Sequence, residues 1–337
     1  LHLLSRRQRQ MCIRDSVLVC GEDDLYTEQM WASIYSLRRY NADARIEILV
    51  DSDTYNYLLV NYNFIFNFVD NIISFEVPHD FSFAAKSRYL KTSIRNIIDG
   101  DFVFLDTDTI VCSDLSKLDQ YAPDILCVND LHVDFLRNPY YQINVKLINQ
   151  VFKTDISNAV NYFNSGVMLV KDNTLTRTFY KSWHENWIQG YTQFALKTDQ
   201  QSLLKTDADF GFIIKPLDGI YNCQIVMSVK YLTQAKIMHF FNNLTLDKDK
   251  KLSPFLNGEL FKKMKEQKHM SKDIEDEIVN CKSSFNSISP IIGYKEFQFL
   301  CSPIGQSMLS LINKKQRWNI VFSFLAYIFN CINKISK

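Results

Sequence analysis

The chain has 337 residues, of which 47% are hydrophobic and 22% charged, so it is too apolar to be disordered and long enough for one large domain with an appendage. Its 38 Lys and Arg residues almost balance its 37 Asp and Glu residues, which argues against electrostatic binding of nucleic acid. A phosphate-bearing partner must therefore be small or held by a metal ion.

The first 16 residues differ from the rest because they contain four Arg and one Asp, whereas the remaining chain is richer in Lys. We expect residues 1–16 to be a spurious or disordered extension, with a transit peptide as the alternative. The folded domain is then expected to span residues 17–250.

From Val17 onward, short apolar runs alternate with amphipathic stretches, which is typical of βαβ units around a sheet covered on both faces. The pattern therefore predicts an α/β fold. Strands are expected at 17–20, 46–50, 102–105, 125–128, 167–170 and 237–241. Helices are expected at 27–40, at 84–98 and after residue 170.

Two of these helices carry informative patterns. In the helix at 84–98, the apolar residues predicted to face inward are Leu90, Ile94, Ile97 and Ile98, and the basic residues predicted to face outward are Arg88, Lys91 and Arg95. The helix after residue 170 has large apolar residues at intervals of four, which we interpret as core: Leu175, Phe179, Trp183 and Trp187.

After residue 241 the chain becomes rich in Lys, Asp, Asn and Ser, and the regular strand pattern ends. We therefore expect residues 251–337 to form an appendage with an amphipathic helix. The eight cysteines include no CxxC pair, which indicates reduced, mostly buried thiols and a cytoplasmic protein. No window approaches the roughly 18 apolar residues of a membrane-spanning helix.

The stretch Asp106-Thr107-Asp108 follows the apolar run FVFL. Two carboxylates at i and i+2 after a strand can turn toward one cation, and hard oxygen ligands suit Mg²⁺ or Mn²⁺, which can bridge the phosphates of a nucleotide. A pair of solvated loop carboxylates is the alternative. A dehalogenase-like phosphatase would instead use Asp106 as nucleophile and Asp108 as acid, but about ninety residues with at least two strands precede the motif here, where that class has it on its first strand.

Three further sites have local interpretations of their own. Gly166 permits close backbone approach before a buried strand, and the neighbouring Asn164 offers an amide to a sugar hydroxyl, unless the segment is an ordinary turn. Thr198 and Gln201 have the spacing of a helix capping box. His239, at the end of an apolar strand, would by itself usually be structural.

Taken in order, these segments resemble glycosyltransferase family 8, the retaining, metal-dependent transferases with a GT-A fold. The resembling blocks are Asp24 and Tyr26 before a helix, Lys86 and Arg88, FVFLDTDTIVCSDLSKL at 102–118, Asp130, YFNSGVMLV at 162–170, TDQQSLL at 198–204 and IMHFF at 237–241. The resemblance therefore implies a GT-A nucleotide-diphospho-sugar transferase fold, a Rossmann-like mixed sheet flanked by helices.

The resemblance also implies roles for these residues. Mn²⁺ or Mg²⁺ would be held by Asp106, Asp108 and His239, with a UDP-sugar as donor. Donor contacts would come from Asp24, Tyr26, Lys86, Arg88 and Asn164. The catalytic set would be Asp199 at the donor sugar, Gln200 beneath the anomeric carbon and Asp130 at the acceptor hydroxyl. The family commonly follows its metal-binding His with Gly and Lys-Pro-Trp, which are missing here, and Lys248, Lys250 or Lys251 would have to replace that lysine.

The implied activity is transfer of a hexose from UDP to a hydroxyl of a glycan or lipopolysaccharide acceptor, with retention at the anomeric carbon. Either Gln200 attacks that carbon, or, as we favour, the acceptor enters on the face that the diphosphate leaves. A non-catalytic module that binds sugar nucleotides or glycans is the alternative.

The C-terminal segment RWNIVFSFLAYIFNCINKISK is apolar with Lys and Arg at its flanks. It is too short to span a bilayer but long enough to lie in the interface. We therefore expect peripheral contact with the inner face of a membrane, consistent with a lipid-linked acceptor, with docking as a core helix as the alternative.

Overall fold

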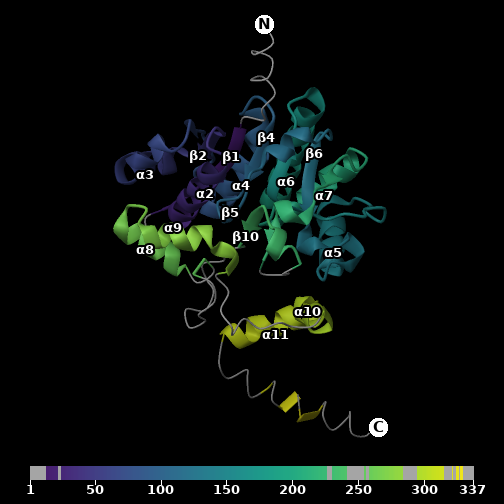
Figure 1. Ribbon diagram of the computed structural model, residues 1–337. Coiled ribbons are helices and arrows are strands. Elements are labelled where there is room, and N and C mark those ends of the chain that lie inside the picture. The colour runs from purple at the N-terminus through teal and green to yellow at the C-terminus, as the bar shows by residue number, and fades with distance from the viewer. Residues whose placement is uncertain are drawn as a thin grey trace. The chain divides into compact units, whose positions relative to one another are not determined.

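The computed structural model describes residues 13–21, 24–225, 230–240, 254–255, 258–283 and 294–314, with 321, 324–325 and 327–328 beyond them (Figure 1). The chain divides into two compact units. The first comprises residues 1–138 and 148–289, and the second comprises residues 139–147 and 290–337.

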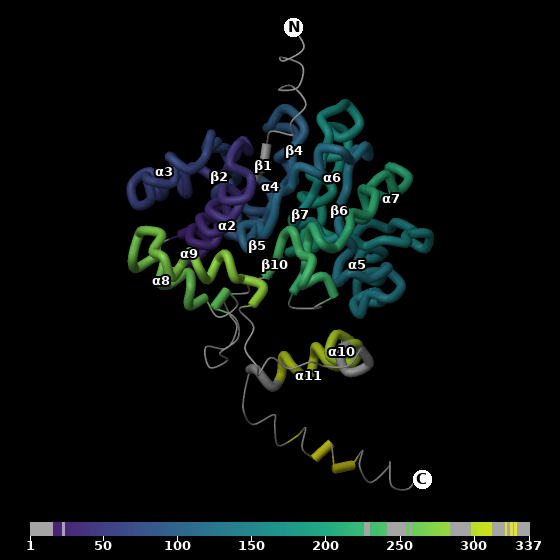
Figure 2. The backbone as a smooth tube through the Cα atoms, in the orientation of Figure 1, coloured from purple at the N-terminus to yellow at the C-terminus, as the bar shows by residue number. Residues whose placement is uncertain are grey.

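A mixed sheet of seven strands forms the centre of the first unit, in the order β3-β2-β1-β4-β7-β6-β8. The strands are β1 (Ile13–Leu18), β2 (Arg45–Val50), β3 (Asn71–Ser74), β4 (Phe102–Leu105), β6 (Ile125–Asn129), β7 (Phe163–Val170) and β8 (Lys215–Pro216). β1 pairs in parallel with β2 and β4, whereas β7 runs antiparallel to both β4 and β6. Figure 2 shows the course of the backbone through these strands. A smaller sheet has the order β5-β10-β9, formed by β5 (Thr109–Val111), β10 (Ile237–His239) and β9 (Cys223–Gln224).

Helices cover both faces of the large sheet, as the apolar pattern predicted. They are α2 (Tyr26–Tyr40), α3 (Ser52–Asn61), α4 (Phe83–Ser93), α6 (Thr174–Phe194), α7 (Gln200–Asp209), α8 (Glu259–Gln267) and α9 (Lys272–Val279). Successive residues of a strand point to opposite faces, and β4 accordingly divides its side chains between two cores. Val103 and Leu105 belong to the core under α2, α8 and α9, and Phe102 and Phe104 belong to the core under α4 and α6.

The structure confirms several expected elements. β4 spans the predicted residues, the expected parallel pairing of the first two strands is present, and Trp183 and Trp187 are fully buried. Leu175, by contrast, is 40% exposed at the start of α6, because the apolar face of that helix meets the core only from its second turn onward.

Two boundaries differ from the expectation. β1 begins at Ile13, because backbone pairing with both β2 and β4 starts there, so four residues assigned to the extension belong to a central strand. Residues 258–283 belong to the first unit and not to an appendage, because α8 and α9 bury apolar side chains in the core under α2: Leu260, Phe261, Met264, Ile274 and Ile278.

Two basic side chains are the clearest correction to the predicted orientation: Lys91 of α4 and Arg95 of the 3-10 turn Ile94–Asn96 that follows it. Lys91 is 5% exposed and Arg95 is fully buried. Arg95 donates to the carbonyl oxygens of Ile98 and Gly100, which closes the turn before β4. Gly100 has a φ of 87°, in the left-handed region that favours glycine. It lies beyond the ends of α4 and of the following 3-10 turn, whose cap positions are Ile94 and Ile97, so the cap expected from a helix ending near residue 98 is not formed.

The second unit contains α10 (Tyr294–Cys301) and α11 (Pro303–Lys314), which pack against each other. α5 (Tyr141–Phe152) begins in this unit and ends in the first. Most of the apolar segment expected to meet a membrane, 318–332, lies outside the described residues. Among the residues that are described, no helix combines the length and apolarity needed to cross a membrane.

Candidate active site

Two carboxylates and one imidazole come together between the two sheets. Asp106 and Asp108 lie in the turn from β4 to β5, and His239 ends β10, which pairs antiparallel with β5. One potential ligand atom from each residue lies within 4.8 Å of the others. This is a donor set of the kind that binds divalent cations. The structure thus brings together the three residues expected as ligands.

Gly166 makes this approach possible. The backbone N–H of Asp106 donates to the carbonyl oxygen of Gly166 at 2.8 Å, which holds β7 against the turn. A Cβ atom at Gly166 would lie 2.2 Å from Cε1 of His239 and 2.9 Å from Oδ2 of Asp106. Any side chain here would therefore collide with two of the three potential ligands, and the close approach predicted for Gly166 is present.

Asn222 orients the imidazole of His239. Its Oδ1 lies 2.9 Å from Nδ1 of His239, and Nε2 of the same ring lies 3.1 Å from Oδ1 of Asp108. This contact turns Nε2 toward the carboxylates, the arrangement typical of a histidine that binds a metal ion. Burial disfavours the charged ring, but Asp108 and Asp106 outweigh this effect and raise the pKa of His239. Nothing in the sequence singled out Asn222.

A network of amides surrounds Asp130, which is buried. Its carboxylate accepts hydrogen bonds from Asn138 at 3.0 Å, Asn164 at 3.3 Å and Gln200 at 3.1 Å. Burial raises the pKa of Asp130, and the three amide donors offset this only in part. Gln200 also donates to the carbonyl oxygen of Phe163 at 3.1 Å, so two acceptors fix the plane of its amide.

Asn164 belongs to this network and not to an open wall. It is 5% exposed, and its Oδ1 accepts from the Gly166 N–H and from Asn222. The amide of Asn164 therefore links Asp130 to Asn222 within the protein.

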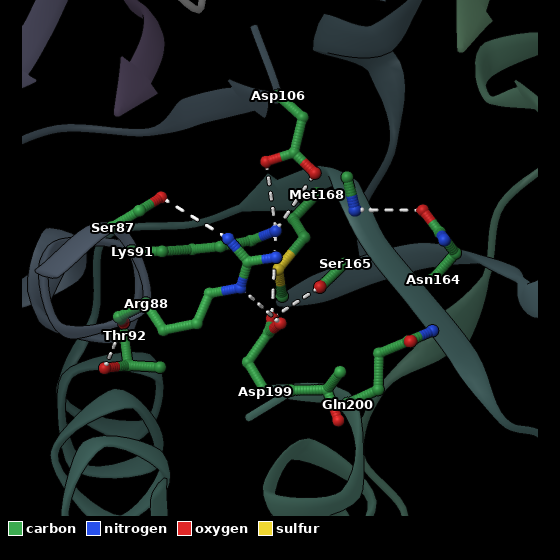
Figure 3. Close-up of polar contacts among 12 residues, drawn as sticks. Ser87, Arg88, Lys91, Thr92, Asp106, Asn164, Ser165, Met168, Asp199 and Gln200 are labelled. Carbon is green, nitrogen blue, oxygen red and sulfur yellow. Dashed lines mark hydrogen bonds and ion pairs between the residues drawn. The ribbon is translucent and has the colours of Figure 1, made fainter. Parts of the chain in front are cut away.

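Asp199 and Asp106 point toward each other with the amino group of Lys91 between them (Figure 3). Asp199 occupies the position before α7 and accepts a hydrogen bond from Ser165 at 2.6 Å. Its other oxygen lies 3.4 Å from Nε of Arg88, and Nζ of Lys91 lies 3.7 Å from the carboxylate. Burial alone would raise the pKa of Asp199, but the two cations lower it below its usual value.

A cavity of about 860 Å³ opens beside the Asp pair. Its wall includes three of the five residues expected to contact the donor, Asp24, Tyr26 and Arg88, together with Asp106 and Asp108. Phe83, which the sequence analysis did not select, also lines it and is 54% exposed. An exposed aromatic ring in a polar cavity suits a flat nucleobase or a sugar face.

Lys86 lies elsewhere. Its Nζ binds Asp51 at 2.8 Å and Asp53 at 3.0 Å, beside a separate cavity of about 350 Å³. It therefore neutralises the start of α3 and does not reach the Asp pair. The loop lysines considered as replacements, at 248, 250 and 251, lie outside the described residues. The expected capping pair is present in altered form, because Thr198 donates to the side chain of Gln201.

The arrangement joins a potential cation site, a polar cavity with aromatic rings, and a buried carboxylate flanked by an amide. Such a set can hold a nucleoside diphosphate through a metal ion and present a sugar to Asp199 and Gln200. These features are shared by several chemistries, so comparison with known proteins is informative.

The glycosyl transferase family 8 profile matches residues 17–245. No curated protein matches the chain. Among solved structures, the galactosyltransferase LgtC, in complex with donor and acceptor sugar analogues, is similar at 15% identity with a TM-score of 0.51, over 78% of this chain and 99% of its own.

Two further solved structures are similar. Mouse xyloside xylosyltransferase 1 has 13% identity and a TM-score of 0.47, over 70% of this chain and 99% of its own. The glycosyltransferase GlyE from Streptococcus pneumoniae TIGR4 has 17% identity and a TM-score of 0.47, over 84% of this chain and 66% of its own. The family match favours a transferase over the phosphatase alternative for the Asp pair. The chain belongs to glycosyl transferase family 8 and is a glycosyltransferase with a GT-A fold.

Proposed function

We propose that the protein transfers a hexose from a UDP-sugar to a hydroxyl group of a glycan or lipopolysaccharide acceptor, with retention of configuration at the anomeric carbon. The observation that carries this proposal is the convergence of Asp106, Asp108 and His239 at the edge of the cavity that contains Asp24 and Tyr26. A nucleotide bound by the last two residues would place its diphosphate beside the first three.

Asp106, Asp108 and His239 are the residues that would hold Mn²⁺ or Mg²⁺. Their fit to a cation is supported by the spacing of the ligand atoms and by the Asn222 contact that turns Nε2 of His239 inward. A bound divalent cation supplies positive charge that stabilises the leaving diphosphate. The glycine at position 166 keeps the space between the ligands clear of side chains.

The donor sugar would lie between the Asp pair and α7. Asp199 is held ionised by Lys91 and Arg88, so it can accept hydrogen bonds from sugar hydroxyls. Gln200 would lie beneath the anomeric carbon, with its amide plane fixed by Asp130 and the carbonyl of Phe163. Asp130 therefore acts through Gln200, and we assign it a positioning role in place of direct contact with the acceptor.

Retention has two routes in this geometry. An amide oxygen is a weak nucleophile, so attack by Gln200 would need strong activation, and its amide nitrogen is already committed to two acceptors. We therefore favour entry of the acceptor hydroxyl on the face from which the diphosphate departs, with a phosphate oxygen taking the proton. In this route Gln200 and Asp199 orient the sugar and shield its other face.

The test is metal-dependent release of UDP from a panel of nucleotide sugars. We expect hydrolysis of one UDP-hexose without acceptor, faster turnover with a glycan acceptor, and loss of both on chelation. Asp199→Asn should lower turnover about 100-fold with the donor still bound. A protein that binds a UDP-sugar and never releases UDP would instead support the binding-module alternative.

We also propose that the second unit contacts the inner face of a membrane, which fits a cytoplasmic protein and a lipid-linked acceptor. α10 and α11 expose the apolar side chains of Phe299 at 51% and Ile304 at 67%, and side chains of this kind can enter a membrane interface. Co-sedimentation with anionic vesicles should fall when both are changed to Ser. A matched double variant at exposed Leu59 and Val60 of α3 should not change it, and equal sedimentation of all three proteins would refute the contact.

A further inference from the structure

The position of Lys91 is unusual for a lysine beside a metal site. The side chain is 6% exposed, and Nζ lies 3.1 Å from Oδ1 and 3.2 Å from Oδ2 of Asp106. The same amino group lies 4.8 Å from the centre of the Phe104 ring. A cation thus sits against one of the carboxylates that the proposed function assigns to the metal.

Stability alone does not explain this arrangement. A buried ion pair generally contributes little net stability, because desolvation of both partners offsets their attraction. Lys91 is also not needed to compensate for the negative charge of Asp199, because that carboxylate already pairs with Arg88 and accepts a hydrogen bond from Ser165. The amino group instead lies between Asp106 and Asp199 (Figure 3).

The charges explain what such a lysine does to the metal site. Asp106 and Asp108 have oxygens within reach of one cation, and Asp199 lies on the other side of the Lys91 amino group, 3.7 Å from Nζ and 3.4 Å from Nε of Arg88. Without Lys91, these three carboxylates would make the site strongly acidic. Such an acidic site binds a divalent cation by itself. With Lys91 present, a cation that arrives alone is repelled by a fixed positive charge at its own ligand, since charges at this range interact strongly in a partly buried site.

A diphosphate reverses this balance. Its negative charge attracts the bound metal ion and the cationic side chains of α4. When the metal ion and the nucleotide bind together, this attraction compensates for the repulsion between the metal ion and Lys91. We propose that Lys91 is a positioning residue whose fixed charge makes metal binding depend on the donor diphosphate. This inference rests on the proposed metal site, and it adds the order in which the site is loaded.

The test measures Mn²⁺ affinity by electron paramagnetic resonance, with and without UDP, and so does not depend on turnover. Wild type should bind Mn²⁺ at least ten times more tightly when UDP is present, and by reciprocity UDP more tightly when Mn²⁺ is present. Lys91→Met should bind Mn²⁺ alone at least ten times more tightly than wild type, a change of about 1.4 kcal/mol, and the effect of UDP should shrink. Lys91→Arg keeps the charge and should behave as wild type.

Lys86→Met is the matched control. Lys86 is another buried lysine of α4 with two carboxylate partners, but those partners are Asp51 and Asp53 and not metal ligands. Its change should leave Mn²⁺ affinity unaltered. Equal or weaker Mn²⁺ binding by Lys91→Met would overturn the proposal. So would independent binding of Mn²⁺ and UDP in wild type, a result that requires no variant to fold.

The same measurements separate this inference from the metal site on which it rests. Asp108→Ala should abolish tight Mn²⁺ binding whether or not Lys91 has the proposed role. If wild type binds no Mn²⁺ under any condition, the metal site is wrong and the role of Lys91 falls with it. If wild type binds Mn²⁺ through Asp108 but UDP has no effect on it, only the role of Lys91 is wrong.

Discussion

Replacement of Gly166 by Ala tests the geometry of the candidate site most directly. The added Cβ would lie 2.2 Å from Cε1 and 2.8 Å from Nδ1 of His239, whereas carbon atoms in contact lie about 3.5 Å apart or more. Either the imidazole or β7 must therefore move by about 1 Å. Overpacking of this kind costs about 1–3 kcal/mol of stability, and a misplacement of about 1 Å in an active site costs about 100-fold in rate.

The measurement has three parts: the thermal midpoint, Mn²⁺ affinity in the presence of UDP, and UDP release. We expect the midpoint of Gly166→Ala to fall by roughly 2–10 °C, with metal affinity and turnover falling about 100-fold. Gly190→Ala in α6 is the matched control, because its Cβ would lie 2.8 Å from Cδ2 of Leu196, away from the cavity. It should lower stability and leave turnover unchanged. Wild-type metal affinity in Gly166→Ala would refute the argument.

Three more outcomes are expected. His239→Ala removes one ligand and should weaken Mn²⁺ binding, and high Mn²⁺ should partly restore its release of UDP. Asp108→Ala removes a charged ligand, so high Mn²⁺ should not restore its activity. Identical metal titrations of His239→Ala and wild type would contradict the assignment of His239 as the third ligand. Burial raises the pKa of Asp207 from 3.8 to about 6, so the folded state binds the proton more tightly, and this residue costs stability progressively as the pH rises from about 4 to about 6 and fully above that. Asp207→Asn should therefore raise the free energy of unfolding, measured by urea unfolding, by up to about 3 kcal/mol at pH 8 and by little at pH 4. A gain that does not depend on pH would contradict this. Deletion of residues 1–12 should leave the thermal midpoint unchanged, whereas deletion of residues 1–16 removes four residues of the central strand β1 and should lower the midpoint. Equal midpoints of the two truncated proteins would show that the strand pairing that begins at Ile13 contributes nothing to stability.

Much of the fold follows from local pattern in the sequence. β4 and α2 were predicted almost to the residue, because alternation and helical periodicity report which face is apolar. The same reasoning misplaced Lys91 and Arg95. A prediction from periodicity assumes that a charged residue is exposed to solvent. A long cationic side chain can nevertheless be buried when carboxylates from distant parts of the sequence lie next to it in the fold. For Lys91 these are Asp106 and Asp199, whose proximity exists only in the folded chain.

In the candidate site, too, residues in local motifs were predicted, whereas residues that act through tertiary contacts were not. Asp106 and Asp108 were found from a short motif after a strand, and His239 from its place in an ordered resemblance. Asn222, which orients His239, carries no such signal, because the two residues are 17 positions apart and come together only when β9 and β10 pair. The segment at 258–283 was assigned to an appendage because its composition is polar, yet two short amphipathic helices suffice to bury five apolar side chains.

The three potential metal ligands come from two sheets and from distant parts of the chain. β5 and β10 pair antiparallel, although a long stretch of chain that includes β7 with Gly166 separates them in the sequence. Closing so long a loop carries an entropic cost that is recovered late in folding. Metal affinity should therefore be absent from partly folded chains and appear as a final event. In refolding experiments, the rate of Mn²⁺ uptake should therefore report the rate at which the native topology is completed.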